Sequence, residues 1–232
     1  MPAYRLGALS VILAVTAVQL NDIAHAAGRT SPCRSSVLRA SRAARLHVFD
    51  HRCHAIRLAY WPGGVPIAAA RSATHAALHV TTGPYHWQGE PVEYVRIGTQ
   101  VIRPMGAHDD WPILAYHPGR LRSVSTPDPQ AAWEMRGGPL LVGGRTFGRT
   151  YDARVMRATT HRRALLWVEG GTAFASLEAW QDLAAVQALM RLWGYTHAFL
   201  LDGGSSASPR ARNPVYVMVV PGERPQQNSG GL

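Results

Sequence analysis

The order of apolar and polar positions along the chain predicts many short strands. A strand is expected where a short run is apolar or alternates between apolar and polar residues, and where glycine, proline or aspartate ends the run. The expected strands are 46–49, 55–60, 76–82, 113–116, 140–142, 163–168, 197–201 and 215–220, with a further hairpin in 92–101. The first two flank Asp50-His51-Arg52 and are expected to pair with each other as a hairpin.

One segment, 177–193, has the pattern of a helix instead. Its apolar residues recur at helical spacing, at Leu183, Val186, Leu189, Met190 and Trp193. Ser176 is suited to cap the start of this helix, Gly194 is suited to end it, and the strand 197–201 follows directly. The combination predicts an α/β (mixed α+β) class, as a single domain with a largely β core and one long helix.

The first 26 residues have the organisation of a secretory signal peptide. Arg5 precedes an uncharged stretch, 6–20, which is shorter than the roughly 20 residues of a membrane span, and Ala24-His25-Ala26 has the form of a cleavage site. We therefore expect 1–26 to be removed and the protein to be periplasmic or secreted. An N-terminal arm (27–45), one folded domain (46–221) and a disordered tail (222–232) are expected to follow.

Composition narrows the possible functions. With 232 residues, of which 47% are hydrophobic and 16% charged, the chain is suited to one globular domain. It contains no lysine, so all 24 basic residues are arginine. This excludes pyridoxal and other Schiff-base enzymes, phosphate-loop nucleotide hydrolases and protein kinases, each of which needs a lysine. A net charge of +10 on an exported protein favours an anionic glycan or envelope polymer over nucleic acid as partner.

The chain has two cysteines, Cys33 and Cys53. Both follow the expected signal peptide, and an even number of cysteines in an oxidising compartment predicts a disulfide bond. A Cys33–Cys53 bond would close a loop of about 20 residues and would stabilise the fold by about 3 kcal/mol.

Three segments carry candidate functional groups. The strand 197–201 ends at Asp202, and Gly203-Gly204-Ser205-Ser206 then offers N–H groups and hydroxyls to a sugar or phosphate oxygen. His161-Arg162-Arg163 leads into another strand, where arginine can bind an anion through two parallel hydrogen bonds. Gly137-Gly138-Pro139 leads into a third expected strand, 140–142. Taken singly, these segments are equally typical of a turn, a solvated arginine pair and a glycine-rich strand entry.

In this order and spacing, the three segments resemble the phosphodiester glycosidase family, which includes the domain of the lysosomal uncovering enzyme and bacterial exported proteins. The matching motifs are Gly137-Gly138-Pro139-Leu140-Leu141, His161-Arg162-Arg163-Ala164, the helical segment from Leu177, and Leu201-Asp202-Gly203-Gly204-Ser205-Ser206. The resemblance covers 46–221 and implies a phosphodiester glycosidase-like domain there. The activity it implies is cleavage of a glycosyl-1-phosphodiester, at the bond between sugar and phosphate.

The resemblance also implies roles for particular residues. Asp202 would stabilise an oxocarbenium-like centre or act as base or nucleophile, Arg163 would bind the leaving phosphate, and His161 would donate a proton or orient the leaving oxygen. The implied substrate-binding residues are Gly203, Gly204, Ser205, Ser206, Thr82, Gly83, Tyr85 and Gly138. No cofactor is implied, a divalent cation stays open, and the sugar, the aglycone and the oligomeric state are not specified.

Some positions depart from the family pattern. Thr82 stands where the family has asparagine, Pro84 replaces its second glycine, and Trp167 replaces a later glycine. Threonine has less donor and acceptor capacity than asparagine. Two functions are therefore open: an exported hydrolase of a glycosyl phosphodiester, or a catalytically inactive protein that binds anionic or phosphorylated glycans.

Histidines near position 50 offer a different interpretation, a metal site. His47, His51 and His54 lie close in sequence to Asp50 and Cys53. Side chains alternate along a strand, so His47 and His54 are expected on opposite faces, and we predict no metal site.

Aromatic side chains near the early turn offer a last set of candidates. The seven tryptophans are more typical of a core than of a sugar-binding surface, and Trp87 and Trp111, in loop-like sequence, are the exceptions best suited to stack against a sugar. His86 is expected to be incidental, although it is close enough to the turn at 82–84 to line a pocket.

Overall fold

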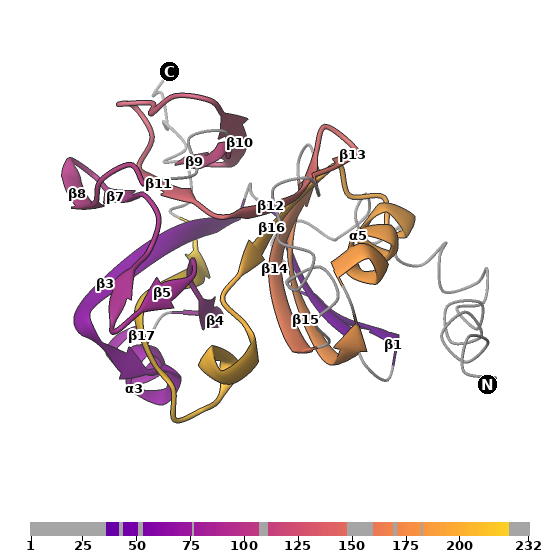
Figure 1. Ribbon diagram of the computed structural model, residues 1–232, viewed down its shortest axis with the longest axis horizontal. Helices are drawn as coiled ribbons and strands as arrows, with labels where there is room; N and C mark the ends of the chain where they lie inside the picture. Colours follow the sequence, from indigo (N-terminus) through magenta and orange to yellow (C-terminus); the bar gives the residue numbers. More distant parts are fainter. Residues whose placement is uncertain are drawn as a thin grey trace, which may run out of the picture.

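The protein is built mainly from β-sheet in its computed structural model (Figure 1). The structure describes residues 36–41, 44–50, 53–75, 77–106, 111–147, 160–168, 171–181 and 183–222. These contain strands β1 to β17, the α-helices α3 and α5, and one short 3-10 helix, η1. Neither of the two described α-helices is long and apolar enough to cross a membrane.

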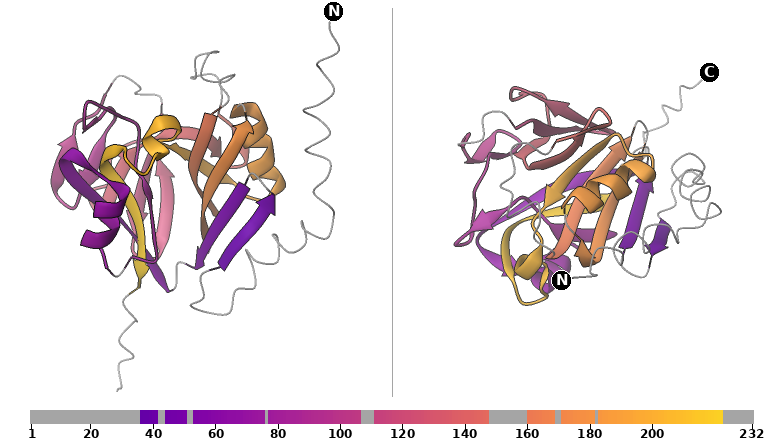
Figure 2. Two further views of the ribbon diagram at one scale, coloured as in Figure 1. Left: turned by 90° about the horizontal axis from the view of Figure 1, so that it is seen from below. Right: turned by 45° about the vertical axis from the view of Figure 1, so that its right-hand side comes forward.

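The largest sheet has seven strands in the order β1-β2-β15-β14-β16-β12-β13, and every neighbouring pair is antiparallel. Its strands are β1 (Ser36–Ser41), β2 (Ala44–Asp50), β15 (Gly171–Gln181), β14 (Thr160–Val168), β16 (His197–Leu201), β12 (Gly138–Val142) and β13 (Arg145–Thr146). Helix α5 (Leu183–Leu192) lies against this sheet (Figures 1 and 2) and buries Leu183, Val186, Gln187 and Met190. The Gln187 amide donates to the Leu140 carbonyl oxygen of β12 at 3.2 Å, which fixes the helix to the sheet.

Two smaller sheets and a hairpin complete the fold. The five-stranded sheet has the order β10-β9-β11-β7-β8, and the three-stranded sheet has the order β3-β17-β4. Their strands are β10 (Arg120–Val124), β9 (Ile113–His117), β11 (Trp133–Arg136), β7 (Val95–Ile97), β8 (Gln100–Arg103), β3 (His54–Pro66), β17 (Arg212–Pro221) and β4 (His79–Thr82). The remaining elements are α3 (Ile67–Ala73), the hairpin of β5 (His86–Trp87) and β6 (Glu90–Pro91), and η1 (Gly204–Ala207).

The main core lies where the seven-, five- and three-stranded sheets meet. Its buried residues are Phe49, Ile56, Leu58, Val95, Leu114, Tyr116, Leu121, Trp133, Met135, Phe199, Leu201, Val215, Val217 and Val219. Strand β17 contributes Val215, Val217 and Val219 to this core, while Tyr216 and Met218 face a second apolar cluster that includes α3. A strand buried on both faces appears in the sequence as a continuous apolar run, as β17 does.

A buried carboxylate, that of Glu134 in β11, holds the five-stranded sheet together. Tyr94 Oη donates to Glu134 Oε2 at 2.7 Å, and Arg96 Nε donates to the same oxygen at 2.9 Å. The backbone N–H of Asp128 donates to Glu134 Oε1 at 2.5 Å, which fixes the loop before β11. Burial, reinforced by the hydrogen bond to Glu134, raises the pKa of Tyr94, so the phenol remains a donor.

The predicted α/β class is wrong, because strands far outnumber helices in the described residues. The helix expected over 177–193 is confined to Leu183–Leu192, and the residues before it form β15. Ser176, expected as the helix cap, lies in the sheet opposite Arg163 of β14 and Arg45 of β2. Pairing with strands on both sides outweighs a capping signal that involves only a few residues. The largely β core is confirmed.

The hairpin predicted around 50–52 is also wrong. Its two strands exist as β2 and β3, but β2 pairs with β1 and β15, whereas β3 pairs with β17. The chain therefore passes from one sheet to another at this point. Pairing of β3 with β17 places Ile56 and Leu58 in the main core beside the valines of β17, which a short local hairpin would not achieve.

Most of the other expected strands are present. Strands β9, β12, β14, β16 and β17 contain the predicted segments 113–116, 140–142, 163–168, 197–201 and 215–220, and β7 and β8 form the hairpin expected in 92–101. Strand β1 and the start of β2 belong to the seven-stranded sheet, within the segment expected as an N-terminal arm.

Several predictions concern residues that the structure does not describe. The signal peptide (1–26), Cys33, His51 and the tail from 223 lie outside the described residues. Cleavage after Ala26 and the Cys33–Cys53 disulfide therefore stay predictions. In the described ranges no group of three or more His, Cys, Asp or Glu side chains is placed to hold a metal ion. The rings of His47 and His79 lie 4.4 Å apart.

Candidate functional site

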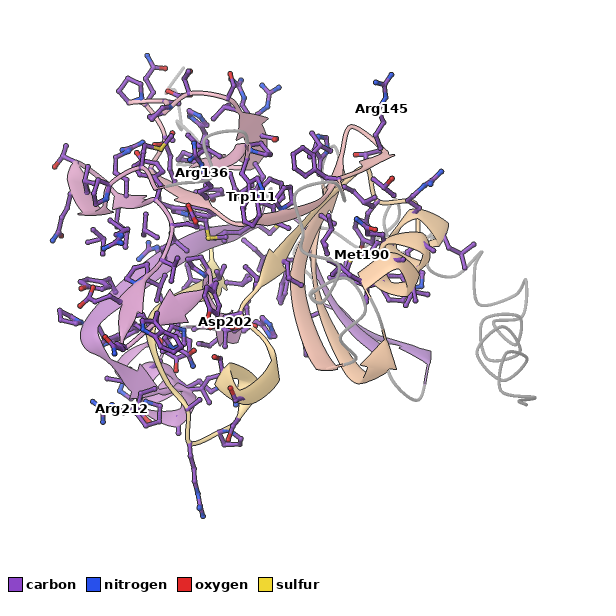
Figure 3. All side chains as sticks on the ribbon, viewed as in Figure 1. Trp111, Arg136, Arg145, Met190, Asp202 and Arg212 are labelled. Atoms are coloured by element: carbon purple, nitrogen blue, oxygen red, sulfur yellow. The ribbon has the colours of Figure 1, made fainter. Side chains whose placement is uncertain are left out.

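Asp202 lies at the carboxyl end of β16, where the seven-stranded sheet meets the three-stranded sheet (Figure 3). The backbone of Asp202 is bonded to the end of β4: its N–H donates to the Gly83 carbonyl oxygen at 2.8 Å. The Thr82 hydroxyl donates to the Asp202 carbonyl oxygen at 2.5 Å. The apolar strands on both sides of this junction must be buried, so the polar residues that end them lie together at the rim.

Gly83 is the residue that allows this close approach. Its N–H donates to the Val215 carbonyl oxygen at 2.9 Å, and a Cβ added at Gly83 would lie 2.7 Å from the same oxygen. No side chain fits there without movement of β17. The Thr82-Gly83 turn is therefore held between β17 on one side and Asp202 on the other.

Replacing Gly83 with alanine is expected to destabilise the protein by about 1–3 kcal/mol, because backbone must move to admit the methyl group. Urea denaturation measures the change. Gly137→Ala is the matched control, since a Cβ at Gly137 would meet its nearest atom, in the Phe199 side chain, at an ordinary 3.4 Å. Equal losses for the two variants would contradict the close approach at Gly83.

The carboxylate of Asp202 faces His86 of β5. The Asp202 Oδ2 and His86 Nδ1 atoms lie 2.6 Å apart, with side-chain exposures of 8% and 13%. This contact lacks the alignment of a full hydrogen bond, and neither atom has another hydrogen-bond partner. With Nδ1 donating to this carboxylate, Nε2 would be the ring nitrogen left to act on a ligand.

The hairpin of β5 and β6 positions His86. Its turn is formed by Gln88 and Gly89, which both have positive φ angles, of 51° and 81°. Two successive positive φ angles are typical of the tight turns that match the twist of a hairpin. His86 lies opposite Pro91 in this hairpin, and the Val92 N–H donates to the Tyr85 carbonyl oxygen at 3.0 Å. The sequence placed His86 close enough to the turn at 82–84 to line a pocket but gave it no role, because its contact with Asp202 is visible only in the structure.

The glycine–serine segment after Asp202 forms η1. Gly204 has a φ of 54°, a left-handed conformation that favours glycine, and Ser205 is exposed while Ser206 is half-buried. The buried Asn213 side chain donates from Nδ2 to the Ser206 carbonyl oxygen at 3.1 Å and so fixes the segment against β17. Sequence reasoning missed Asn213, whose position just before Pro214 in an apolar strand was its only signal.

Arg163 and His161 lie on β14, the strand beside β16. Arg163 is opposite Leu201 in the register, so its backbone is next to the strand end that carries Asp202. The side chains of both residues are outside the described part of the structure, and their roles stay predictions. Gly138 flanks β16 on the other side, opposite Leu200.

The register also locates the departure at Trp167. This residue is opposite His197, at the far end of β16 from Asp202. Trp167 is four positions beyond Arg163 along β14, which corresponds to roughly 13 Å. A tryptophan at this position therefore does not lie beside the Asp202 end of the sheet.

Comparison with known proteins gives likenesses in structure alone. No family model matches the chain, and no curated protein matches it in sequence. The catalytic domain of zebrafish N-acetylglucosamine-1-phosphodiester alpha-N-acetylglucosaminidase, a structure auto-inhibited by its pro-peptide, superposes with a TM-score of 0.61 at 15% identity, covering 85% of this chain and 86% of that domain.

Two bacterial structures give similar results. A hypothetical protein from Synechocystis superposes with a TM-score of 0.60 at 10% identity over 80% of this chain, which spans 61% of the length of that protein. A protein from Burkholderia pseudomallei gives a TM-score of 0.51 at 12% identity, covering 77% of this chain and 74% of that one. The chain therefore shares its fold with these proteins, among them the catalytic domain of the zebrafish enzyme.

Proposed function

We propose that the protein is an exported hydrolase that cleaves a glycosyl-1-phosphodiester in an envelope or extracellular glycan. The observation that carries this proposal is the buried Asp202 carboxylate, 2.6 Å from His86, at a strand end of a fold shared with a phosphodiester glycosidase. A paired carboxylate and imidazole with residual exposure at a sheet rim are suited to acid–base catalysis. The fold likeness supports the class of reaction but does not carry it alone.

The chemistry of the bond explains the choice of residues. When the bond between the anomeric carbon and the phosphate oxygen breaks, positive charge develops on the sugar and the phosphate leaves as an anion. The Asp202 carboxylate stabilises the positive charge, and His86, oriented through Nδ1 by Asp202, accepts the proton of the attacking water at Nε2. A reducing sugar and a phosphomonoester are released, and the proton passes from His86 to solvent.

The phosphate side of the substrate is suited to arginine. Arg163, at the start of the strand beside Asp202, is proposed to hold the leaving phosphate with its planar guanidinium. The chain carries 24 arginines and a net charge of +10, which attracts polyanionic glycans to its surface. Export follows from the expected signal peptide.

Replacing His86 with glutamine or asparagine is expected to lower kcat/KM by about a hundredfold or more on an activated sugar-1-phosphodiester. Asparagine keeps a donor near the Nδ1 position, so it preserves the contact with Asp202 but has no group to accept a proton. Full activity of His86→Asn would show that His86 only positions Asp202. His117→Gln is the matched control, because His117 pairs with Asp128 at 3.0 Å, away from Asp202, and this variant should keep full activity.

The second candidate is a non-catalytic protein that binds anionic or phosphorylated glycans. One observation favours it: Thr82 is buried and its hydroxyl donates to the Asp202 carbonyl oxygen, so it has fewer hydrogen-bonding groups left for a substrate than the asparagine of the family pattern. Absence of turnover across a panel of sugar-1-phosphodiesters, together with retained binding of a phosphorylated glycan, would support this candidate over the hydrolase.

A further inference from the structure

A second candidate binding site lies at the β5–β6 hairpin that carries His86. It is an open hollow of about 540 Å³, lined by Tyr85, Trp87, Gln88, Glu90, Pro91, Val92 and Arg103. Tyr85 and Trp87 line the hollow, whereas His86 between them in sequence does not. Neither His86 nor Asp202 lines the hollow, so it is separate from the carboxylate–imidazole pair, although Tyr85 is among the substrate-binding residues that the family resemblance implies.

Two aromatic side chains dominate this hollow and are unusually exposed. Tyr85 is 56% exposed and Trp87 is 65% exposed. Large aromatic side chains on a surface are the groups through which proteins most often bind partners, because they offer a rigid apolar face at low entropic cost. The hairpin that carries them is held by the tight turn at Gln88 and Gly89, so the surface is formed before any ligand binds.

The polar groups of the hollow indicate which ligand would fit. Glu90 supplies acceptors, Arg103 supplies donors and Gln88 supplies both, while the two charges balance each other. Tyr60 Oη donates to Glu90 Oε2 at 3.0 Å, which holds the carboxylate in place. A sugar ring has an apolar face of C–H groups and a rim of hydroxyls that both donate and accept, so it matches an aromatic face bordered by balanced polar groups.

We infer that this hollow binds a neutral sugar unit of the substrate, away from the bond that is cleaved. The inference rests on the proposed function, because it makes the substrate a glycan with several sugar units rather than a single sugar phosphate. The geometry permits it: Trp87 follows His86 directly, so their Cα atoms are about 3.8 Å apart. A glycan chain that passes over the edge of the narrow hairpin would reach both sites.

The test measures sugar binding separately from catalysis. Asp202→Asn protein is titrated with a panel of neutral tetrasaccharides of glucose, mannose and N-acetylglucosamine at millimolar concentrations, and the heat of binding is followed by isothermal titration calorimetry. At least one tetrasaccharide is expected to give a saturable change. Adding Trp87→Ala should weaken that binding by about tenfold or more, whereas Trp87→Phe, which keeps an aromatic face, should retain most of it. Leu192→Ala, at an exposed apolar residue on α5, is the matched control and should bind normally.

The outcomes separate this inference from the proposed function. In otherwise wild-type protein, Trp87→Ala should keep full turnover of a small activated sugar-1-phosphodiester. Binding that depends on Trp87 in a protein without hydrolase activity would support the hollow and contradict the proposed reaction. Absence of Trp87-dependent binding for every tetrasaccharide, or concentration-dependent self-association that Trp87→Ala abolishes, would overturn the inference.

Discussion

Replacing Asp202 with asparagine is expected to lower kcat/KM by about a thousandfold or more on an activated sugar-1-phosphodiester. The substitution keeps the shape of the side chain and removes the negative charge that stabilises the developing positive charge on the sugar. It also removes the carboxylate that lies 2.6 Å from His86 Nδ1, so the imidazole loses its orienting partner. Steady-state kinetics on purified protein measure the effect.

Stability provides the necessary control for Asp202→Asn. The backbone of Asp202 makes the hydrogen bonds to Thr82 and Gly83, and these do not depend on the carboxylate, so the midpoint of urea denaturation should change little. Asp128→Asn is the matched control for activity, because Asp128 also pairs with a histidine, His117. Retained activity in Asp202→Asn would remove Asp202 from the mechanism.

Replacing Glu134 with alanine is expected to destabilise the protein by about 3–5 kcal/mol. Glu134 is 0% exposed, and its carboxylate accepts hydrogen bonds from Tyr94, Arg96 and the Asp128 backbone. Its loss leaves a nearly buried guanidinium without its counter-ion and two donors without their acceptor. Urea denaturation measures the free energy of unfolding.

The control for Glu134 is the exposed Glu90. Its carboxylate accepts a hydrogen bond from Tyr60 on the surface, so Glu90→Ala should cost less than about 1 kcal/mol. A loss in Glu134→Ala as small as that in Glu90→Ala would show that the buried carboxylate does not hold the five-stranded sheet together.

Short apolar strands were predictable because their pattern depends on burial alone. Strand β16 occupies the predicted 197–201, and β17 contains the predicted 215–220, since both are buried and end at polar or special residues. The start of the helix was not predictable. The residues of β15 pair with β14 and β2, and the partner in β2 is more than a hundred residues away in sequence, so no local signal at Ser176 could reveal it.

The candidate site was predictable in part for the same reason. Asp202 ends an apolar strand and precedes glycines, which indicated a rim position. Thr82 and Gly83 were expected, like the residues after Asp202, to contact the substrate, and the hydrogen bonds of Asp202 place them beside it. His86 was considered incidental, because a two-residue strand such as β5 has too few positions to show alternation, and its contact with Asp202 spans distant parts of the chain.

Asn213 illustrates a second kind of omission. A buried amide inside a strand is recognisable only from the groups that it bonds, here the Ser206 carbonyl oxygen and Tyr216 Oη. In contrast, Trp167 drew attention as a departure from the family pattern, and the register places it at the end of the sheet away from Asp202. The sequence showed that Trp167 departs from the family pattern, but it could not show how far Trp167 lies from Asp202.

The most direct test of the central claim follows the oxygen of water during turnover. Wild-type protein is incubated with a sugar-1-phosphodiester in oxygen-18-labelled water, and both products are analysed by mass spectrometry. Cleavage at the anomeric carbon, with Asp202 stabilising the sugar, predicts that the label enters the sugar and that the released phosphomonoester is unlabelled. Label in the phosphate would mean attack at phosphorus and would contradict a glycosidase site built on Asp202 and His86. Absence of turnover would contradict it as well.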